Sequence, residues 1–341
     1  MIVRIGRRLA GLLATLLASS FVIFAAIYAA PGDPAVFLAG GRDTLTPERL
    51  AAVREQYHLD EPLVVQYGRW LWDCLHLDLG RSFQYGDEVA DLLAARFPTT
   101  LELVAYATVL FVVLGVGAGA LAALNRGRWI DSAVVGATTL AASVPSFVGG
   151  IALVALFGVQ LGWFPVTGSG EGLVGTLHHL TLPAVAMALG ALAVVSRVTR
   201  QAVVDADGAD HVAVARSSGL PEREVVRRHV LRNALGPIVT MCTLVTAGML
   251  AGTVAIETVF GLSGIGSLLV GAINSHDFPV AQAVLLLMVT CYVVVTTLVD
   301  LAHPLLDPRL NRSSHLALQE DSDSALDQGP ARRQTALHEI S

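Results

Sequence analysis

Apolar residues fall into six long runs separated by polar segments. The first run, Leu9–Ala30, would measure roughly 33 Å as an α-helix, enough to cross a bilayer core of about 30 Å. It is longer than the apolar stretch of about 7–15 residues in a cleaved signal peptide, so we expect a retained helix. Five further runs are expected to span a membrane: Leu101–Leu124, Val134–Leu161, Leu180–Val198, Ile238–Val259 and Val280–Leu301. The pattern therefore predicts an all-α integral membrane protein with six transmembrane helices.

Two local signals add detail to these runs. The tetrapeptide Ser-Val-Pro-Ser at residues 143–146 interrupts the third run. Proline removes a backbone donor, so we expect a kink there, with neighbouring hydroxyl groups bonding the freed carbonyl. Between the first two runs, Thr-Pro-Glu at residues 46–48 is typical of a helix N-terminus and predicts a short amphipathic helix to about Tyr57.

The distribution of arginine predicts the orientation in the membrane. Residues 4–8 hold three arginines before the first run, and residues 197–232 hold seven between the fourth and fifth runs. Arg126 and Arg128 lie in a short loop on the same side, whereas the short loops 162–179 and 260–279 have none. Because short cytoplasmic loops carry the excess of basic residues, we expect both termini to be cytoplasmic.

Composition excludes several kinds of chemistry. Hydrophobic residues make up 54% of the 341 residues and charged residues 15%, against about 25% charged in soluble domains. All 22 basic residues are arginine, so the chain has no phosphate-binding lysine of a Walker A loop. The three cysteines form neither a disulfide framework nor a Cys-x-x-Cys metal motif. We therefore expect no catalytic residue, metal or cofactor in this chain, with any ATP and Mg²⁺ bound by partner subunits.

The chain divides into four expected segments. Residues 1–30 form the first transmembrane helix, and residues 31–98 form an extracytoplasmic loop with a small helical elaboration. Residues 99–312 form a five-helix core that includes a long cytoplasmic loop, 199–236. Residues 313–341 are rich in Ser, Asp, Glu and Gln and lack aromatic residues, so we expect a disordered cytoplasmic tail.

The long cytoplasmic loop carries clear helix signals. A helix over Asp210–Ser218 is expected to end at Gly219, because glycine followed by an apolar residue and Pro221 is a strong stop signal. Pro221 opens a second helix, in which Glu224 and Arg228 are spaced to pair at i,i+4. The first helix has a face of small residues that would let a partner approach closely, with polar groups beside it: Ala209, Ala213, Ala215 and Ser218, then His211 and Arg216. The alternative is an ordinary solvated loop that anchors the orientation.

A resemblance to a known family favours a partner-docking role for this loop over an ordinary solvated loop. The segment Asp210–Pro221 resembles the coupling loop of binding-protein-dependent ABC importer permeases, nearest to the first permease of the dipeptide, oligopeptide and nickel branch. The expected glutamate of the general signature is replaced by Ala213, which leaves Asp210 and Arg216 as candidates for the polar contact with the ATPase. Other segments resemble the same branch in the same order: 31–34, 66–67, 78–83, 96–101, 143–147, 257–260, 264–266 and 306–309.

The resemblance implies a function and an assembly. It implies a type I ABC importer-like permease fold in the bacterial cytoplasmic membrane, and import of peptides, nickel chelates or similar small solutes by alternating access. The implied partners are a second homologous permease, two ATPase subunits, an extracytoplasmic solute-binding protein and membrane lipid, without nucleic acid. The residues that would dock the ATPase are Asp210, His211, Ala213, Ala215, Arg216, Gly219, Leu220 and Pro221.

Candidate residues for a solute path lie in the fifth run. Thr243, Thr246, Thr253 and Glu257 fall within about an 80° arc at about 100° per residue, so they form one polar stripe. The alternative is that the threonines bond their own backbone and Glu257 merely lies at the membrane interface. Gly248 and Gly252 lie on another face and would suit close helix packing. Two serines at the expected kink are further path candidates: Ser143 and Ser146.

Two other function classes are weaker. A self-sufficient ion-coupled transporter needs ionisable groups near the membrane midplane, whereas Glu102, Glu257 and Asp300 lie near helix ends. A rhomboid-like intramembrane protease would use the Gly-Leu-Ser-Gly sequence at 261–264. The only candidate histidine of the sixth helix, His303, follows the sixth run at the opposite face of the membrane, and His276 lies in the connecting loop. The glycine-rich sequence at 115–120 resembles a dinucleotide-binding motif, but it lies inside an apolar run, so we expect it to serve helix packing.

Overall fold

The computed structural model describes residues 2–29, 35–36, 46–56 and 58–306. The predicted disordered tail, 313–341, lies outside the described residues. The helices up to Thr297 belong to one compact unit, and every contact reported below lies within it.

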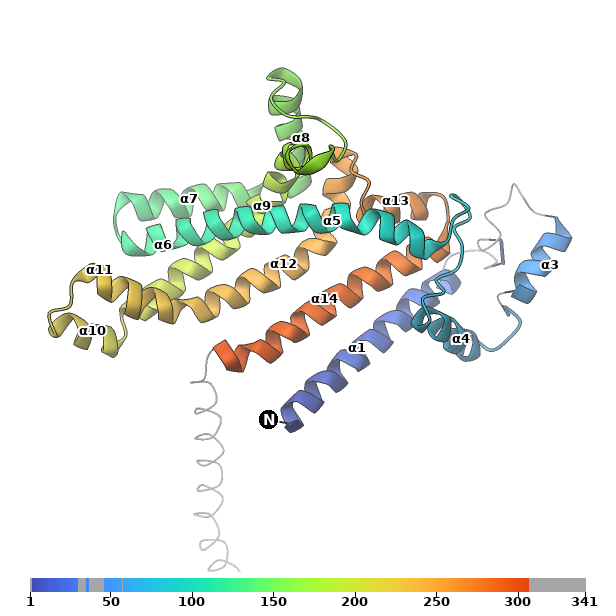
Figure 1. Cartoon of the computed structure of the whole chain (residues 1–341), viewed down its shortest axis with the longest axis horizontal. Coiled ribbons are helices and arrows are strands. Elements are labelled where there is room, and N and C mark those ends of the chain that lie inside the picture. The colour runs from blue at the N-terminus through green and yellow to red at the C-terminus, as the bar shows by residue number, and fades with distance from the viewer. Residues whose placement is uncertain (1, 30–34, 37–45, 57, 307–341) are drawn as a thin grey trace, which may run out of the picture. The chain divides into compact units, whose positions relative to one another are not determined.

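Helices make up the secondary structure of the described residues, without a strand, as the apolar runs predict (Figure 1). Five helical segments are long and apolar enough to cross a membrane, or six if one bent pair counts as a single span. The five are α1 (Ile2–Ala29), α5–η2–α6 (Val89–Phe111, Val112–Val116, Gly117–Leu124), α9 (Gly172–Asp207), α11–η4–α12 (Glu222–Val225, Val226–Leu231, Arg232–Phe260) and α14 (Phe278–Leu306).

The third predicted span is the bent pair. Helix α7 (Trp129–Ser143) meets α8 (Ser146–Leu153), which continues as the π-helical segment η3 (Val154–Gln160), at an angle of 93°. Val144 and Pro145 have extended backbone angles at the break, and Ser143 Oγ donates a hydrogen bond to the Thr139 carbonyl at 2.9 Å. The predicted kink is confirmed. The predicted hydroxyl bond to the carbonyl freed by Pro145 stays a prediction, because Ser143 bonds the carbonyl four residues before itself and not the one four residues before Pro145.

Helix α9 is the centre of the bundle and packs against α5, α6, α7, α8 and α12. Helix α9 comes very close to α6 at Gly119. A Cβ there would lie 2.6 Å from Thr199 Cβ and even closer to the Ser196 carbonyl oxygen, so only glycine lets the two backbones meet. The interpretation of the glycine-rich 115–120 sequence as a packing element is confirmed. The apolar core around α9 includes large, fully buried side chains: Leu103, Phe111, Leu180, Ile256 and Phe260.

The first extracytoplasmic segment contains helices α3 (Pro47–Gln56) and α4 (Leu63–Leu75). The predicted helix after residue 46 is confirmed in α3. Helix α5 begins at Val89, however, so the expected loop boundary at residue 98 was wrong. The sequence pattern missed this start because Asp91 and Arg96 interrupt the apolar character of the first turns, and because Pro98 lies inside the helix.

A loop before α5 is fastened to the turn between α13 (Ile265–Asn274) and α14. Ser82 Oγ donates a hydrogen bond of 2.5 Å to Asp277 Oδ2, and the Gln84 amide donates to the same oxygen at 3.2 Å. Ser82 and Asp277 are both buried. The hydrogen bond between Ser82 and Asp277 joins positions 195 residues apart and holds the loop before α5 on the helix bundle.

Candidate functional site

The coupling segment of residues 207–233 forms the end of the bundle between α9 and α12 (Figure 1). Helix α10 (Asp210–Ser217) stops as predicted: Gly219 has φ of +78°, in the left-handed region that favours glycine. Pro221 then precedes α11, and the predicted pair of Glu224 and Arg228 is present at 2.7 Å. The helix boundaries expected from the sequence are therefore confirmed to within one residue.

The inner face of α10 packs on the bundle. Val212 is fully buried and Ala215 is 6% exposed, and both belong to an apolar cluster with residues of α9, α11 and α12. The prediction that Ala215 contributes to a docking surface is therefore contradicted, because its methyl group faces this chain's own core. Sequence spacing placed it beside the outer residues, but only the packing direction of α10 decides which face is covered.

The outer face of α10 is open. Ala213, Val214 and Ser217 are exposed, with Val214 at 64%. At either end of the helix the exposed surface continues through residues that were predicted for docking: Asp210, Gly219, Leu220 and Pro221. Because most of these exposed side chains are short, the backbone of another protein can come close to this face of α10.

Arg216 acts as a clamp inside this chain. Its Nη2 atom lies 2.6 Å from Asp207 Oδ1 at the end of α9 and 2.7 Å from Glu222 Oε1 at the start of α11. The two carboxylates raise the pKa of the Arg216 guanidinium above its ordinary value, mainly because they accept hydrogen bonds from it, Glu222 first and Asp207 second. Arg216 is therefore engaged by two internal partners, which leaves Asp210 as the better candidate for a polar contact with another subunit.

A second contact fixes α10 to α12. His211 Nε2 lies 2.7 Å from Asn233 Nδ2, and that amide also donates to the His229 carbonyl. The predicted docking residue His211 thus contacts a residue of this chain and helps to hold α10 in place against α12. Together with the Arg216 clamp, it joins α10 to both long helices of the segment.

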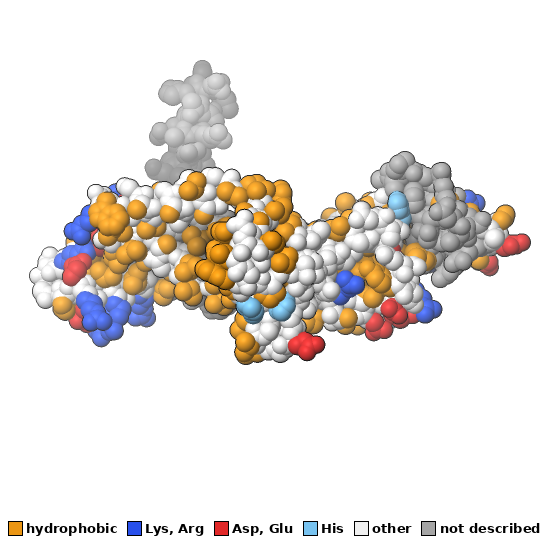
Figure 2. Space-filling model, turned by 90° about the horizontal axis from the view of Figure 1, so that it is seen from above, with side chains coloured by type: hydrophobic (Ala, Val, Ile, Leu, Met, Phe, Trp, Pro, Cys, Tyr) orange, Lys and Arg blue, Asp and Glu red, His pale blue; other side chains and the backbone are white. Residues whose placement is uncertain are grey.

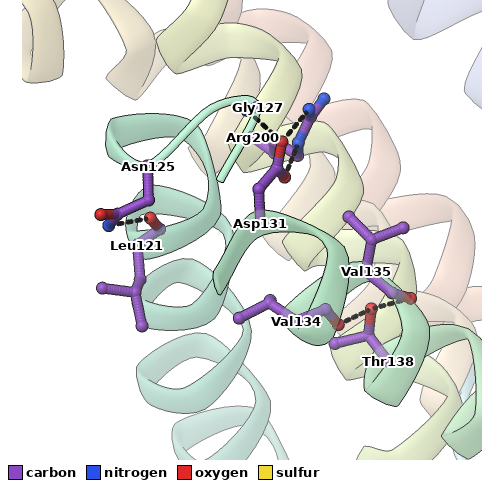
Figure 3. Close-up of polar contacts among 8 residues, drawn as sticks. All are labelled: Leu121, Asn125, Gly127, Asp131, Val134, Val135, Thr138 and Arg200. Atoms are coloured by element: carbon purple, nitrogen blue, oxygen red, sulfur yellow. Dashed lines mark hydrogen bonds and ion pairs between the residues drawn. The ribbon is translucent and has the colours of Figure 1, made fainter. Parts of the chain in front are cut away.

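An ion pair ties α7 to α9 at the same end of the bundle (Figure 3). Asp131 accepts two hydrogen bonds of 2.7 Å from the Arg200 guanidinium and one of 3.2 Å from the Gly127 amide. Basic side chains gather at this end, next to a surface of mainly apolar side chains (Figure 2). In the sequence, Asp131 and Arg200 lie just outside the third and fourth apolar runs, and nothing there indicates that they pair.

The threonines of the candidate path bond their own helix. Thr243, Thr246 and Thr253 donate to the carbonyls of Val239, Cys242 and Leu250 at 2.8 to 2.9 Å. Thr246 also lies 3.2 Å from Thr108 of α5, and Thr253 is fully buried. The alternative interpretation of the stripe, with hydroxyls bonded to the helix backbone, holds for all three.

Glu257 lies at a buried junction of three helices. Thr100 Oγ1 of α5 donates to Glu257 Oε1 at 2.6 Å, and the Ser267 amide of α13 donates to Oε2 at 2.9 Å. Thr100 Oγ1 also accepts from the Ile265 amide at 2.9 Å, so the first turn of α13 is held on α5 and α12 together. Glu257 has no exposed surface, which contradicts its predicted place on a solute path in this conformation.

The glycines around this carboxylate have a structural reason. Gly261 ends α12 with φ of +59°. A Cβ at Gly264 would overlap the Glu257 carboxylate, and one at Gly266 would lie 2.6 Å from Val254 Cα. The Gly-Leu-Ser-Gly sequence at 261–264 therefore forms a tight turn that lets the backbone approach Glu257.

One face of α12 borders an open cavity of about 230 Å³ between α8, α9 and α12. Ser146 lies on its wall, as do Gly248 and Gly252. A Cβ at either glycine would meet nothing within 4 Å, so the prediction of close helix packing there was wrong within this chain. Ser143 is exposed near the bend and bonds its own helix.

Within the described residues, no group of three or more His, Cys, Asp or Glu side chains could hold a metal ion. His178 Nε2 lies 3.0 Å from the Trp163 carbonyl, and His179 Nδ1 lies 2.9 Å from the Gly175 carbonyl. His178 therefore fastens the loop before α9, whereas His179 bonds the first turn of its own helix.

Comparison with known proteins identifies the family. Residues 1–104 match the N-terminal part of membrane components of binding-protein-dependent transport systems. Residues 115–312 match the family described as "Binding-protein-dependent transport system inner membrane component". The chain belongs to this family. As a binding-protein-dependent inner membrane component, it is a multi-pass, non-catalytic permease subunit of an ABC importer, and ATP hydrolysis belongs to separate subunits.

Its relatives match over nearly their whole length. A Brucella abortus (strain 2308) protein, named as a permease of a peptide transport system, is 37% identical over 307 residues, covering 89% of this chain and 97% of that protein. The glutathione transport system permease protein GsiC of Escherichia coli (strain K12) is 34% identical over 304 residues, with 89% and 97% covered. The resemblance to the peptide branch is thereby confirmed.

A solved structure supports the fold. A chain of the MetNI methionine ABC transporter superposes with a TM-score of 0.54 at 18% identity, covering 63% of this chain and 96% of that chain. The binding-protein-dependent permease described here therefore has the predicted type I importer permease fold. Family membership also rules against the ion-coupled transporter and the rhomboid-like protease.

Proposed function

We propose that this permease subunit imports short peptides or peptide-like solutes such as glutathione. The names of two relatives, a peptide permease and a glutathione permease, support this substrate class. Nickel chelates are the alternative within the same branch. The proposed assembly contains a second similar permease, two ATPase subunits that bind ATP and Mg²⁺, and an extracytoplasmic binding protein, embedded in lipid.

The proposed mechanism rests on the two faces of α10, one buried and one exposed. Its inner face packs on the bundle through Val212 and Ala215, while its outer face presents Ala213 and Val214. We propose that this outer face docks on an ATPase subunit. Because Arg216 binds both α9 and α11, displacement of α10 would move these helices with it and drive alternating access.

We also propose that the solute path follows the open face of α12 rather than the predicted polar stripe. Ser146, Gly248 and Gly252 line the cavity beside this face, whereas Thr253 and Glu257 are fully buried. Small residues leave room for a solute between α8, α9 and α12. Thr243, which is partly exposed on α12, stays a candidate.

An arginine at position 213 is expected to uncouple the transporter. The Ala213→Arg side chain would stand on the outer face of α10 and keep a partner from close contact, while the core beneath stays intact. We expect at least a tenfold loss of labelled-dipeptide uptake in cells and loss of ATPase subunits that co-purify with the permease. Competition by unlabelled tripeptide, glutathione and Ni²⁺ in the same assay identifies the substrate class.

Ala52→Arg provides the matched control, because Ala52 is exposed on the extracytoplasmic helix α3. It should retain uptake and the ATPase subunits. Normal uptake and co-purification in Ala213→Arg would contradict docking through α10, and competition by Ni²⁺ without competition by peptides would contradict the peptide assignment.

The path is tested by cysteine reactivity in the assembled transporter, after Cys74, Cys242 and Cys291 have been replaced by alanine. Cysteines introduced at Ser146 and Gly248 should react with a water-soluble thiol reagent during transport at least tenfold faster than one at Thr253. Equal protection of all three positions would contradict a path along this face.

A further inference from the structure

Helix α4 has an apolar face that no other part of the described chain covers. Val64 and Leu75 are 74% and 72% exposed, and Trp72 is 64% exposed. At about 100° per residue, Val64, Leu75 and Trp72 lie within an arc of about 80°. Large apolar side chains that share one exposed face of a helix indicate a partner surface.

The opposite face of α4 packs on α1. Tyr67 Oη lies 2.8 Å from Ser20 Oγ and donates to the Leu17 carbonyl at 3.2 Å. The aromatic rings of Trp70 and Phe24 have centroids 5.5 Å apart. Helix α4 lies beside one end of α1 (Figure 1). The contacts of Tyr67 and Trp70 fasten it there.

The contacts between Tyr67 and α1 indicate how deep α4 lies relative to the apolar span of α1. The apolar span of α1 runs over Gly6–Ala26, with the arginine-bearing end in the cytoplasm. Ser20 precedes Ala26 by six residues, which is about 9 Å along a helix. Because Tyr67 reaches this depth, α4 lies beside the last apolar turns of α1 rather than beyond the membrane. Its uncovered apolar face therefore lies at the level of the lipid.

The polar side of α4 has a different environment. Arg69 pairs with Glu61 at 2.9 Å, and Gln66 donates to the Glu61 carbonyl at 2.7 Å. An adjoining open groove of about 890 Å³ has charged walls that include Arg69, Asp73 and Arg81. Water, rather than lipid, suits this side of the helix.

We propose that α4 is an interfacial helix that lies in the outer leaflet of the membrane, with Val64 and Leu75 among the acyl chains, Trp72 at the boundary between lipid and the aqueous groove, and Arg69 and Asp73 at the aqueous side. An apolar face with tryptophan on one side and charges on the other is the pattern that binds a helix in the interface plane. The partner is the lipid surface itself. This proposal rests on the membrane location of α1 and is independent of the proposed coupling and substrate.

Spin labels on single cysteines test this arrangement. The assembled transporter, with its native cysteines replaced by alanine, is reconstituted in phosphatidylethanolamine and phosphatidylglycerol vesicles without a binding protein. Labels at Val64 and Leu75 should collide with oxygen more often than with a water-soluble nickel chelate, by at least threefold. Labels at the matched positions Arg69 and Asp73 should show the reverse ratio.

Two outcomes would overturn the proposal. High collision rates with the nickel chelate at Val64 and Leu75 would place the face in water. Low collision rates with both reagents at these positions would show that another protein subunit covers the face. Uptake by each labelled variant is measured in separate vesicles to which the binding protein and ATP are added, so that a loss of transport is distinguished from a change in lipid contact.

Discussion

Glu257→Leu is expected to leave little folded permease in the membrane. The substitution keeps the size of the side chain but removes the acceptor for Thr100 Oγ1 and for the Ser267 amide. A buried donor without a partner costs about 1–3 kcal/mol, and native proteins are stable by only about 5–15 kcal/mol. We therefore expect a large fall in the yield of monodisperse protein and in its thermal unfolding midpoint, measured by size-exclusion chromatography of the detergent-extracted chain during a temperature series.

Two variants serve as controls for this prediction. Glu257→Gln keeps one carbonyl oxygen as an acceptor and should have an intermediate effect. Glu102→Leu makes the same change at an exposed position of α5 and should be nearly neutral. If Glu257→Leu is as stable as Glu102→Leu and loses only transport, the carboxylate belongs to the solute path and not to the helix junction.

Gly119→Ala is the second substitution with a large expected effect. The added methyl group would press on the Ser196 carbonyl and would lie 2.6 Å from Thr199 Cβ, so α6 and α9 must move apart. Overpacking of this kind costs about 1–3 kcal/mol. We expect a lower thermal unfolding midpoint and reduced uptake, since α9 is the helix on which most of the bundle packs.

Gly117→Ala is the matched control in the same helix. A Cβ at Gly117 would meet nothing within 4 Å, and the position is exposed. Alanine favours the helical state over glycine by about 1 kcal/mol, so this variant should be neutral or slightly stabilised. Equal stability of the Gly119→Ala and Gly117→Ala proteins would contradict the close approach of α6 and α9.

Local signals made much of the fold predictable from sequence. Long apolar runs, the proline at 145 and the glycine at 219 act through the backbone of their own segments, and the spans, the bend and α10 followed from them. Helix α13 was missed because Ile265–Asn274 is too short to give a spanning signal. The early start of α5 was missed because charged residues dilute its first turns.

The candidate site was less predictable because its contacts join distant positions. Glu257 could be placed on a polar stripe of its own helix, but its partner Thr100 lies 157 residues away. Likewise, the pattern of small residues on α10 could not show that Ala215 faces inward while Ala213 faces outward. Periodicity gives the faces of one helix, whereas the choice of neighbour depends on the packing of the whole bundle.

The polar ties described above fasten two groups of helices within the bundle. Glu257 holds α5, α12 and α13 together, and Asp131 holds α7 to α9. Among the ion pairs of the described residues, those of Arg216 alone connect the two groups, since Asp207 ends α9 and Glu222 begins the segment that leads into α12. The short helix that carries Arg216 thus links the end of α9 to the segment that leads into α12, at the place where the chain passes from one group to the other.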